Sequence, residues 1–153
     1  MLIDKYNSEG YFDPTTYAAL HNVEKEEKAA LRAADFPTAD GYRPLVYICS
    51  PYSGDIKRNV ENARKYSRFA FEQHNIPMTP HLLYPQFIND KDPAERYIAC
   101  HVINYVLVGK CKELWVFGGV ILKGMDHEMN LAKRRHMKIR YFTVECEEVE
   151  VCE

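Results

Sequence analysis

From Pro44 onward, short apolar runs alternate with longer segments of helical periodicity, and this alternation constrains the fold more than any other feature. Runs of about five residues rich in Val, Ile, Tyr and Phe are typical of buried parallel strands. Strands that alternate with helices form a parallel sheet with helices on both faces. The expected strands are 45–49, 76–80, 113–117 and 138–142, and the expected helices are 55–74, 93–110 and 124–136. The sequence therefore predicts an α/β domain with a compact flavodoxin-like or Rossmann-like parallel sheet of four to five strands.

The first 41 residues differ from the rest and are expected to form a helical N-terminal arm, followed by the α/β domain at 42–153. Asp13-Pro14 is typical of a helix start, with Asp as N-cap and Pro at the first helical position. The helix should extend to about Ala34, with a break or bend near His21-Asn22. Because the arm is too small for a core of its own, it is expected to pack on the main domain or on a partner subunit.

Three further patterns concern the main domain. On the expected helix 55–74, a spacing of i, i+3, i+7 and i+10 predicts a buried stripe that consists of Val60, Ala63, Ser67 and Ala70. Residues 81–92 are expected to form a loop. The tail, 145–153, alternates acidic residues with valine and fits an edge strand or disorder.

Composition bounds the class of protein. A chain of 153 residues fits one domain, and its net charge of −2 gives no general attraction to nucleic acid or anionic membrane. No apolar run approaches the roughly 20 residues of a membrane span, and the N-terminus lacks the features of a secretory signal. We therefore expect a cytoplasmic protein with neither a nucleic-acid nor a membrane partner.

The cysteines and histidines do not form a ligand pattern. The chain has five Cys and six His, with no Cys-x-x-Cys and no His-x-x-x-His pair. This pattern argues against a disulfide scaffold and against a metal site. Cys49, Cys100 and Cys111 lie in apolar surroundings and are expected to be small core residues.

Glu128 is the strongest candidate for chemistry. Projected as a helix, residues 124–132 place this carboxylate inside an apolar arc formed by Met125, Met129, Leu131 and Ala132. A charge on a core-facing stripe needs a partner or a function, because burial of an unpaired charge is costly. Gly118-Gly119 follows a strand, so Glu128 should point into the crevice at the carboxyl end of that strand. The alternative is a structural Glu paired with a neighbouring Arg or Lys.

The loop after the first strand, Ser50-Pro51-Tyr52-Ser53-Gly54, precedes a helix start. Backbone N–H groups and the helix dipole make such a position a natural anion site. Ser50 and Ser53 are candidates to bind a phosphate or a sugar hydroxyl, although a simple N-cap and turn fits the same residues. The loop is neither a Walker motif nor Gly-x-Gly-x-x-Gly.

Tyr47 lies in the first strand, three residues before this loop. A strand tyrosine is usually a core residue. If Tyr47 shares the crevice with Glu128, its hydroxyl would orient the carboxylate and favour the ionised form. An ionised, oriented carboxylate that faces a sugar is the nucleophile of retaining glycoside chemistry.

Three stretches, 46–54, 111–118 and 124–132, resemble the nucleoside 2-deoxyribosyltransferase-like family. This family includes deoxyribosyltransferases, nucleoside 5′-monophosphate N-glycosidases and many phage and mobile-element proteins of unknown activity. The resemblance implies that Glu128 attacks C1′ of the deoxyribose and that Tyr47 orients it. It implies no metal or organic cofactor. The substrate-binding residues expected on this basis are Ser50, Tyr52, Ser53, Gly54, His81, Asn104, Gly118, Gly124 and Met125.

The sequence departs from the family pattern at two positions. Six residues before the nucleophile the family usually carries Ser or Asp, and this chain has Leu122. The aspartate that assists the departing base is expected at Tyr105, with Asn104 beside it. Asn104, Asp90 and Asp92 are candidates to replace it. His81 follows the second strand and is expected either to reach the base or to be structural.

Three functions fit these observations. The first is cleavage or transfer of the N-glycosidic bond of deoxynucleosides or nucleoside 5′-monophosphates. The second is a nucleotide-binding sensor or sequestering protein without turnover, and the third is an assembly protein that joins subunits through its helical arm. Under the first, the partner is a small-molecule nucleoside or nucleotide. The resemblance also implies a homo-oligomer in which residues 84–92 complete a neighbouring pocket.

Overall fold

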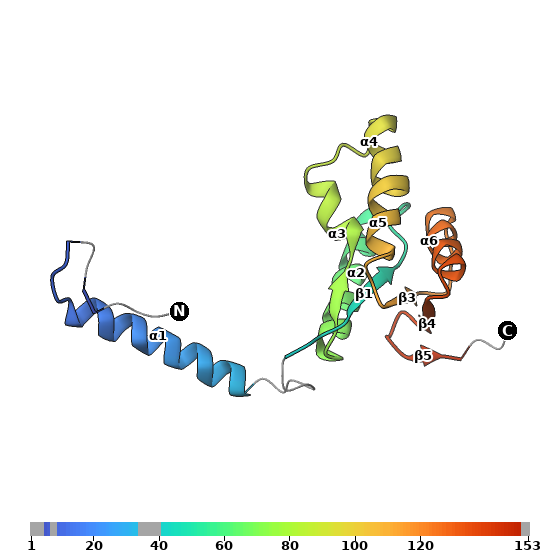
Figure 1. Ribbon diagram of the computed structural model, residues 1–153. Coiled ribbons are helices and arrows are strands. Elements are labelled where there is room, and N and C mark those ends of the chain that lie inside the picture. The colour runs from blue at the N-terminus through green and yellow to red at the C-terminus, as the bar shows by residue number, and fades with distance from the viewer. Residues whose placement is uncertain (1–4, 7–8, 34–40, 151–153) are drawn as a thin grey trace. The chain divides into compact units, whose positions relative to one another are not determined.

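Five strands form one sheet in the computed structural model, in the order β2-β1-β3-β4-β5 (Figure 1). The structure describes residues 5–6, 9–33 and 41–150. Strands β1 to β4 are parallel, and β5 pairs antiparallel with β4. The strands are β1 Leu45–Cys49, β2 Ile76–Met78, β3 Glu113–Phe117, β4 Lys138–Phe142 and β5 Glu148–Val149. The predicted α/β fold is confirmed, with one correction: the fifth strand is antiparallel, because the chain reverses tightly after β4.

The helices of this unit are α2 Ile56–Glu72, α3 Pro80–Leu83, the 3₁₀ turn η1 Tyr84–Gln86, α4 Pro93–Tyr97, the π-helix η2 Ile98–Ile103, α5 Asn104–Val108 and α6 Lys123–Arg134. The prediction of a plain loop at 81–92 is wrong, because α3 and η1 occupy its first half. Each of these turns has a proline in its first two positions, where the missing N–H is tolerated. The predicted helix 93–110 ends at Val108 and is interrupted by the π-helical turn.

Two apolar layers hold the sheet. Side chains of a strand alternate between its faces, so Val46 and Ile48 face α2 while Tyr47 and Cys49 face α5 and α6. On the α2 side, the buried residues are Val46, Ile48, Tyr66, Ala70, Trp115, Phe117 and Phe142. On the other side they include Tyr47, Cys49, Val108, Leu114, Val116, Met125, Met129, Leu131 and Ala132. The apolar arc predicted around Glu128 is therefore buried against the sheet.

The buried stripe of α2 differs from the predicted one. Ala63 and Ala70 are buried as expected, but Val60 and Ser67 are only half-buried. Tyr66 is buried instead, and its ring stacks on Phe117 with 4.3 Å between ring centroids. The small residues on either side make room for this large ring between the helix and the sheet.

Cys100 does not have the predicted core position. Cys49 and Cys111 are buried, as expected, whereas Cys100 is exposed. It lies in η2 and belongs to neither of the two buried apolar clusters. An apolar sequence neighbourhood predicted burial here, but the helix 93–108 is apolar on its solvent side as well.

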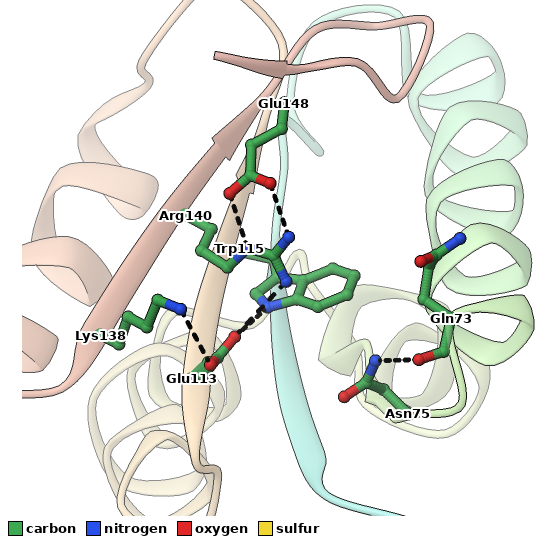
Figure 2. Close-up of polar contacts among 7 residues, drawn as sticks. All are labelled: Gln73, Asn75, Glu113, Trp115, Lys138, Arg140 and Glu148. Atoms are coloured by element: carbon green, nitrogen blue, oxygen red, sulfur yellow. Dashed lines mark hydrogen bonds and ion pairs between the residues drawn. The ribbon is translucent and has the colours of Figure 1, made fainter. Parts of the chain in front are cut away.

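The sheet edge at β4 and β5 is held by an ionic network around Arg140 (Figure 2). The guanidinium Nε and Nη2 of Arg140 donate to the two carboxylate oxygens of Glu148, each at 2.7 Å. The same guanidinium stacks over the ring of Trp115, whose Nε1 donates to Glu113 at 2.8 Å. Because β5 pairs with β4 through only two residues, this bidentate contact helps to hold β5 along the sheet edge.

The arm forms a separate compact unit, residues 1–42, and the α/β unit covers 43–153. Helix α1, Pro14–Ala33, begins as predicted, because the Asp13 carboxylate accepts the N–H of Thr16 at 3.0 Å. The predicted break near His21-Asn22 is wrong: α1 is continuous through it. His21 stacks on Tyr17 one turn earlier, with 5.8 Å between the ring centroids.

The Tyr66 stack predicts a large loss of stability on truncation. Tyr66→Ala should lower the free energy of unfolding by about 3–5 kcal/mol, because it leaves a cavity between α2 and the sheet. Chemical denaturation measures this value. Phe71→Ala, on the exposed side of the same helix, is the matched control and should cost about 1 kcal/mol or less. Equal losses in the two variants would contradict this account of the core.

Candidate active site

A cavity of about 410 Å³ lies at the carboxyl end of β1, between the start of α2 and the start of α6. Parallel α/β sheets bind ligands at this edge, where successive connections leave in opposite directions. Here β1 leads to β2 on one side, while β3 lies on its other side. The lining residues are Ser50, Tyr52, Ser53, Gly54, Ile56, Pro80, His81, Asp90, Arg96, Cys100, Asn104, Leu122, Gly124, Met125 and Glu128.

Glu128 is held by donors from two other elements. The Tyr47 hydroxyl, from β1, donates to Oε1 of Glu128 at 2.9 Å. The Asn104 side-chain amide, from α5, donates to the same oxygen at 3.0 Å. Within the part of the chain that the structure describes, Glu128 forms no ion pair, so it is not the structural Arg or Lys partner that the sequence left open. Neither of these donors holds the second oxygen, Oε2.

Burial changes the pKa values of Glu128 and Tyr47. Loss of hydration raises the pKa of Glu128 to about 7, although hydrogen bonds from Tyr47, Cys49 and Asn104 act in the opposite direction. The pKa of Tyr47 is raised well above its usual value, mainly by burial and also by the adjacent Glu128. Near neutral pH, Glu128 therefore exists in both forms, and Tyr47 remains a hydrogen-bond donor to it.

Contacts with His81 and Asn59 fix the loop after β1. Ser50 is buried, and its Oγ lies 3.0 Å from Nε2 of His81. Burial lowers the pKa of His81 to about 4, so the ring is neutral at neutral pH. The Tyr52 ring lies tilted against His81, with 5.9 Å between centroids. The Asn59 amide donates to the carbonyls of Tyr52 and Ser53 at 3.1 and 2.9 Å, which fixes the loop.

The N-terminus of α2 already has an anionic partner. The carboxylate of Asp55 caps this helix by accepting the N–H of Arg58 at 3.2 Å. Gly54, just before the cap, has a φ of +95°, a conformation that suits glycine and turns the chain into the helix. The helix start that the sequence marked as an anion site is thus partly satisfied by the protein's own carboxylate.

The opposite wall comes from the segment before α4. Arg96 donates through Nε and Nη2 to the backbone carbonyl of Asp90, at 3.0 and 2.6 Å. The Tyr52 hydroxyl forms a hydrogen bond with the Asp90 side chain. The Glu95 carboxylate accepts the N–H of Asn89 at 2.7 Å. These contacts bind the connection between η1 and α4 to the β1 loop on the other side of the cavity.

Sequence reasoning missed several lining residues, namely Ile56, Pro80, Arg96 and Cys100. Arg96, Cys100 and Asn104 share a spacing of four residues, which was the available signal. In a regular α-helix, each step of four residues drifts by about 40° around the axis, so the three would not stay in line. In the wider π-helical turn η2, each residue rotates the chain about the helix axis by a smaller angle. The three side chains therefore stay in line and face the cavity.

Four expected positions have other places or roles. Tyr105 is half-exposed beneath the guanidinium of Arg135, and Asn104 rather than Tyr105 faces Glu128. Gly118 does not line the cavity: its N–H donates to the carbonyl of Phe142 where the chain leaves β3. Asp92 caps α4 by accepting the N–H of Ala94, whereas Asp90 is the acid that reaches the cavity. Leu122 lines the cavity with an apolar surface.

A larger hollow, about 800 Å³, lies along β4 and β5 and contains none of the expected site residues. Among the described residues, no group of three His, Cys, Asp or Glu side chains is placed to hold a metal ion. No helix in the described ranges combines the length and apolar character needed to cross a membrane.

Comparison with protein families places the α/β unit. A family model described as Domain of unknown function (DUF7768) matches residues 44–142. The chain belongs to this family. No curated protein matches the chain. Among solved structures, a 2-deoxyribosyltransferase from Bacillus psychrosaccharolyticus is similar in fold, with a TM-score of 0.56 and 10% identity over 69% of this chain and 77% of that one.

The raised pKa of Glu128 predicts that stability depends on pH. A carboxyl group with a native pKa of about 7 and an ordinary value of 4.5 favours folding in its protonated form. This contribution is complete below pH 4.5 and is lost as the pH rises to about 7. Relative to Glu128→Gln, the wild-type free energy of unfolding should fall over this window by up to roughly 3 kcal/mol. If the free energies of unfolding of the two proteins change with pH in parallel, the raised pKa of Glu128 is refuted.

Proposed function

We propose that this DUF7768 protein cleaves or exchanges the N-glycosidic bond of deoxynucleosides or nucleoside 5′-monophosphates, with Glu128 as the nucleophile. One observation carries the proposal: a half-buried carboxylate lines a cavity and is oriented through a single oxygen by Tyr47 and Asn104. Two donors on Oε1 fix the plane of the carboxylate, and Oε2 is then the oxygen that attacks. The similarity in fold to a 2-deoxyribosyltransferase supports the same chemistry.

The reaction needs two steps. Ionised Glu128 attacks C1′ of the sugar, the C1′–N bond breaks, and a glycosyl ester forms on Oε2. Water or a second base then attacks C1′ and releases the carboxylate. The cavity volume of about 410 Å³ lies within the range of small-molecule sites. Ser50, Ser53 and the neutral His81 ring line its wall. In this proposal they bind the sugar and the base.

A nucleotide-binding protein without turnover is the second candidate. Leu122 gives the cavity an apolar wall, and Asn104 offers an amide rather than an acid beside Glu128. Such a protein would bind a nucleotide tightly and return it intact. Calorimetry followed by chromatography of the recovered ligand separates the two candidates, because free base appears only with the first.

We also propose that the chain forms a homo-oligomer through the helix 93–108. From 97 to 109 this segment contains no Asp, Glu, Lys or Arg. A helix that is apolar all round is normally covered on both sides. About a two-fold axis, this face of one copy packs against the same face of a second copy. The exposed apolar side chains are Tyr97, Ile98, Val102, Tyr105 and Val106.

The nucleophile assignment predicts the outcome of one substitution. Glu128→Gln should reduce base release by at least about 10³-fold, because the amide cannot form the glycosyl ester. The assay incubates the protein with deoxy- and ribonucleosides and their monophosphates and quantifies free base. Asp126→Asn, on the exposed face of the same helix, is the matched control and should retain activity.

The pH dependence of turnover gives a second test of Glu128 as the nucleophile. Wild-type turnover should rise with pH through a midpoint near 7 and then level off, since the ionised carboxylate attacks. Turnover by Glu128→Gln at the wild-type rate would show that the nucleophile is elsewhere.

The proposed interface predicts that one charge dissociates the oligomer. Val102→Glu places a carboxylate in the centre of the exposed apolar face, and sedimentation velocity should show a shift toward the monomer. Val144→Glu, a partly exposed valine outside this helix, should leave the oligomer intact. A monomeric wild-type protein at micromolar concentration would contradict the proposal.

A further inference from the structure

The groups that touch Glu128 cannot supply a proton to a departing base. Asn104 is an amide, which donates a hydrogen bond but does not lose a proton at ordinary pH. The hydrogen of the Tyr47 hydroxyl is already directed at Glu128, and the raised pKa of this phenol keeps it there. The Cys49 thiol also hydrogen-bonds to Glu128, and burial raises the pKa of this thiol well above its usual value. Glu128 itself must be ionised in order to attack. The immediate surroundings of the nucleophile therefore lack a general acid.

The remaining lining groups do not fill this role. His81 is neutral, because burial lowers its pKa to about 4, and Nε2 is engaged with Ser50. Burial raises the pKa of the Tyr52 hydroxyl and of the Cys100 thiol, so both hold their protons more firmly than usual. The Asp90 side chain accepts the hydrogen bond of the Tyr52 hydroxyl. Apart from Glu128, which serves as the nucleophile, the lining groups His81, Tyr52 and Cys100 are therefore not proton donors matched to neutral pH.

The charges of the cavity favour a cation. Asp90 and Glu128 bring two carboxylates to its wall, and Arg96 is the one lining cation among the described residues. The guanidinium of Arg96 is bonded to a backbone carbonyl at the edge of the site. Tyr52 also brings an aromatic ring to the wall, and such a ring attracts a positively charged heterocycle.

These observations, which rest on the proposed glycosidic chemistry, define a substrate class. We propose that the site acts on N-glycosides whose departing heterocycle is already a cation, such as ribosyl pyridinium compounds or N7-alkylated purine deoxynucleosides. Such a group needs no proton in order to leave. Oε2 of Glu128 forms the bond to C1′, and the electron pair of the C1′–N bond moves into the ring and neutralises its positive charge. Water then attacks C1′, the ester bond to Glu128 breaks, and one proton passes to solvent.

The test compares 7-methyl-2′-deoxyguanosine with 2′-deoxyguanosine, which share the sugar and differ in the charge of the base. In the wild-type protein, kcat/KM for the methylated compound should exceed that for the neutral one by at least about 10³-fold. Because general acid catalysis is worth about 10²–10⁴-fold, Asn104→Asp should speed release of guanine and reduce this ratio at least 10-fold. The carboxyl group introduced at position 104 lies beside Glu128. The like charge of Glu128 raises the pKa of this new group and keeps it protonated. Asn104→Ala removes the hydrogen bond without adding an acid and should not reduce the ratio.

A wild-type protein that cleaves both compounds within 10-fold of each other would overturn the cationic preference and leave the glycosidic function intact. An unchanged ratio in a folded Asn104→Asp protein would overturn the missing general acid as the cause of the preference. Release of base from neither compound by either protein would remove the proposed function itself. A series of pyridinium and pyrimidine nucleosides tests the wild-type protein without a variant. Its kcat/KM should fall steeply as the basicity of the departing ring rises, and a flat dependence would overturn the inference.

Discussion

The hydrogen-bonded carboxylate of Glu128 is the interaction on which the site depends. A charge between a sheet and a helix is costly unless donors surround it. This chain supplies those donors from a strand, Tyr47, and from a second helix, Asn104. Because both bonds converge on one oxygen, the arrangement fixes the orientation of the group and ties together three elements that are distant in sequence. The contacts that make burial of this carboxylate tolerable therefore also hold it at the wall of the cavity.

The order of the strands determines where this site can lie. Strand β1 is central, and it has β2 on one side and β3 on the other. Its carboxyl end thus faces connections that diverge, which leaves room for a ligand. The residues on the two sides of β1 serve different purposes: Ile48 packs under α2, and Tyr47 reaches Glu128. Alternation along a single strand thus places Ile48 in the layer under α2 and Tyr47 in the layer that contains Glu128's helix.

The regular parts of the fold could be predicted from the sequence. The bounds of β1, β3 and β4 follow directly from their apolar runs, and the arc around Glu128 follows from helical spacing. The short turns α3 and η1 were missed, because each is shorter than the period on which a helix is recognised. At the site, helical spacing singled out Glu128, whereas a strand tyrosine such as Tyr47 is usually a core residue and its role was implied by the family resemblance. The role of Arg96 was missed, since its position depends on a helical geometry that residue types do not reveal.

The π-helical turn Ile98–Ile103 has a consequence for how this protein can change. Such a turn is equivalent to one extra residue inserted into an α-helix. Loss of a single residue from this stretch would rewind it to α geometry and rotate everything before it by about 100°, while Asn104 stayed on Glu128. The wall that carries Arg96 would then swing aside, and Glu128 would keep its hydrogen bonds from Tyr47 and Asn104. A change of length in this one turn is thus a way to reshape the cavity wall without disturbing the contacts of Glu128.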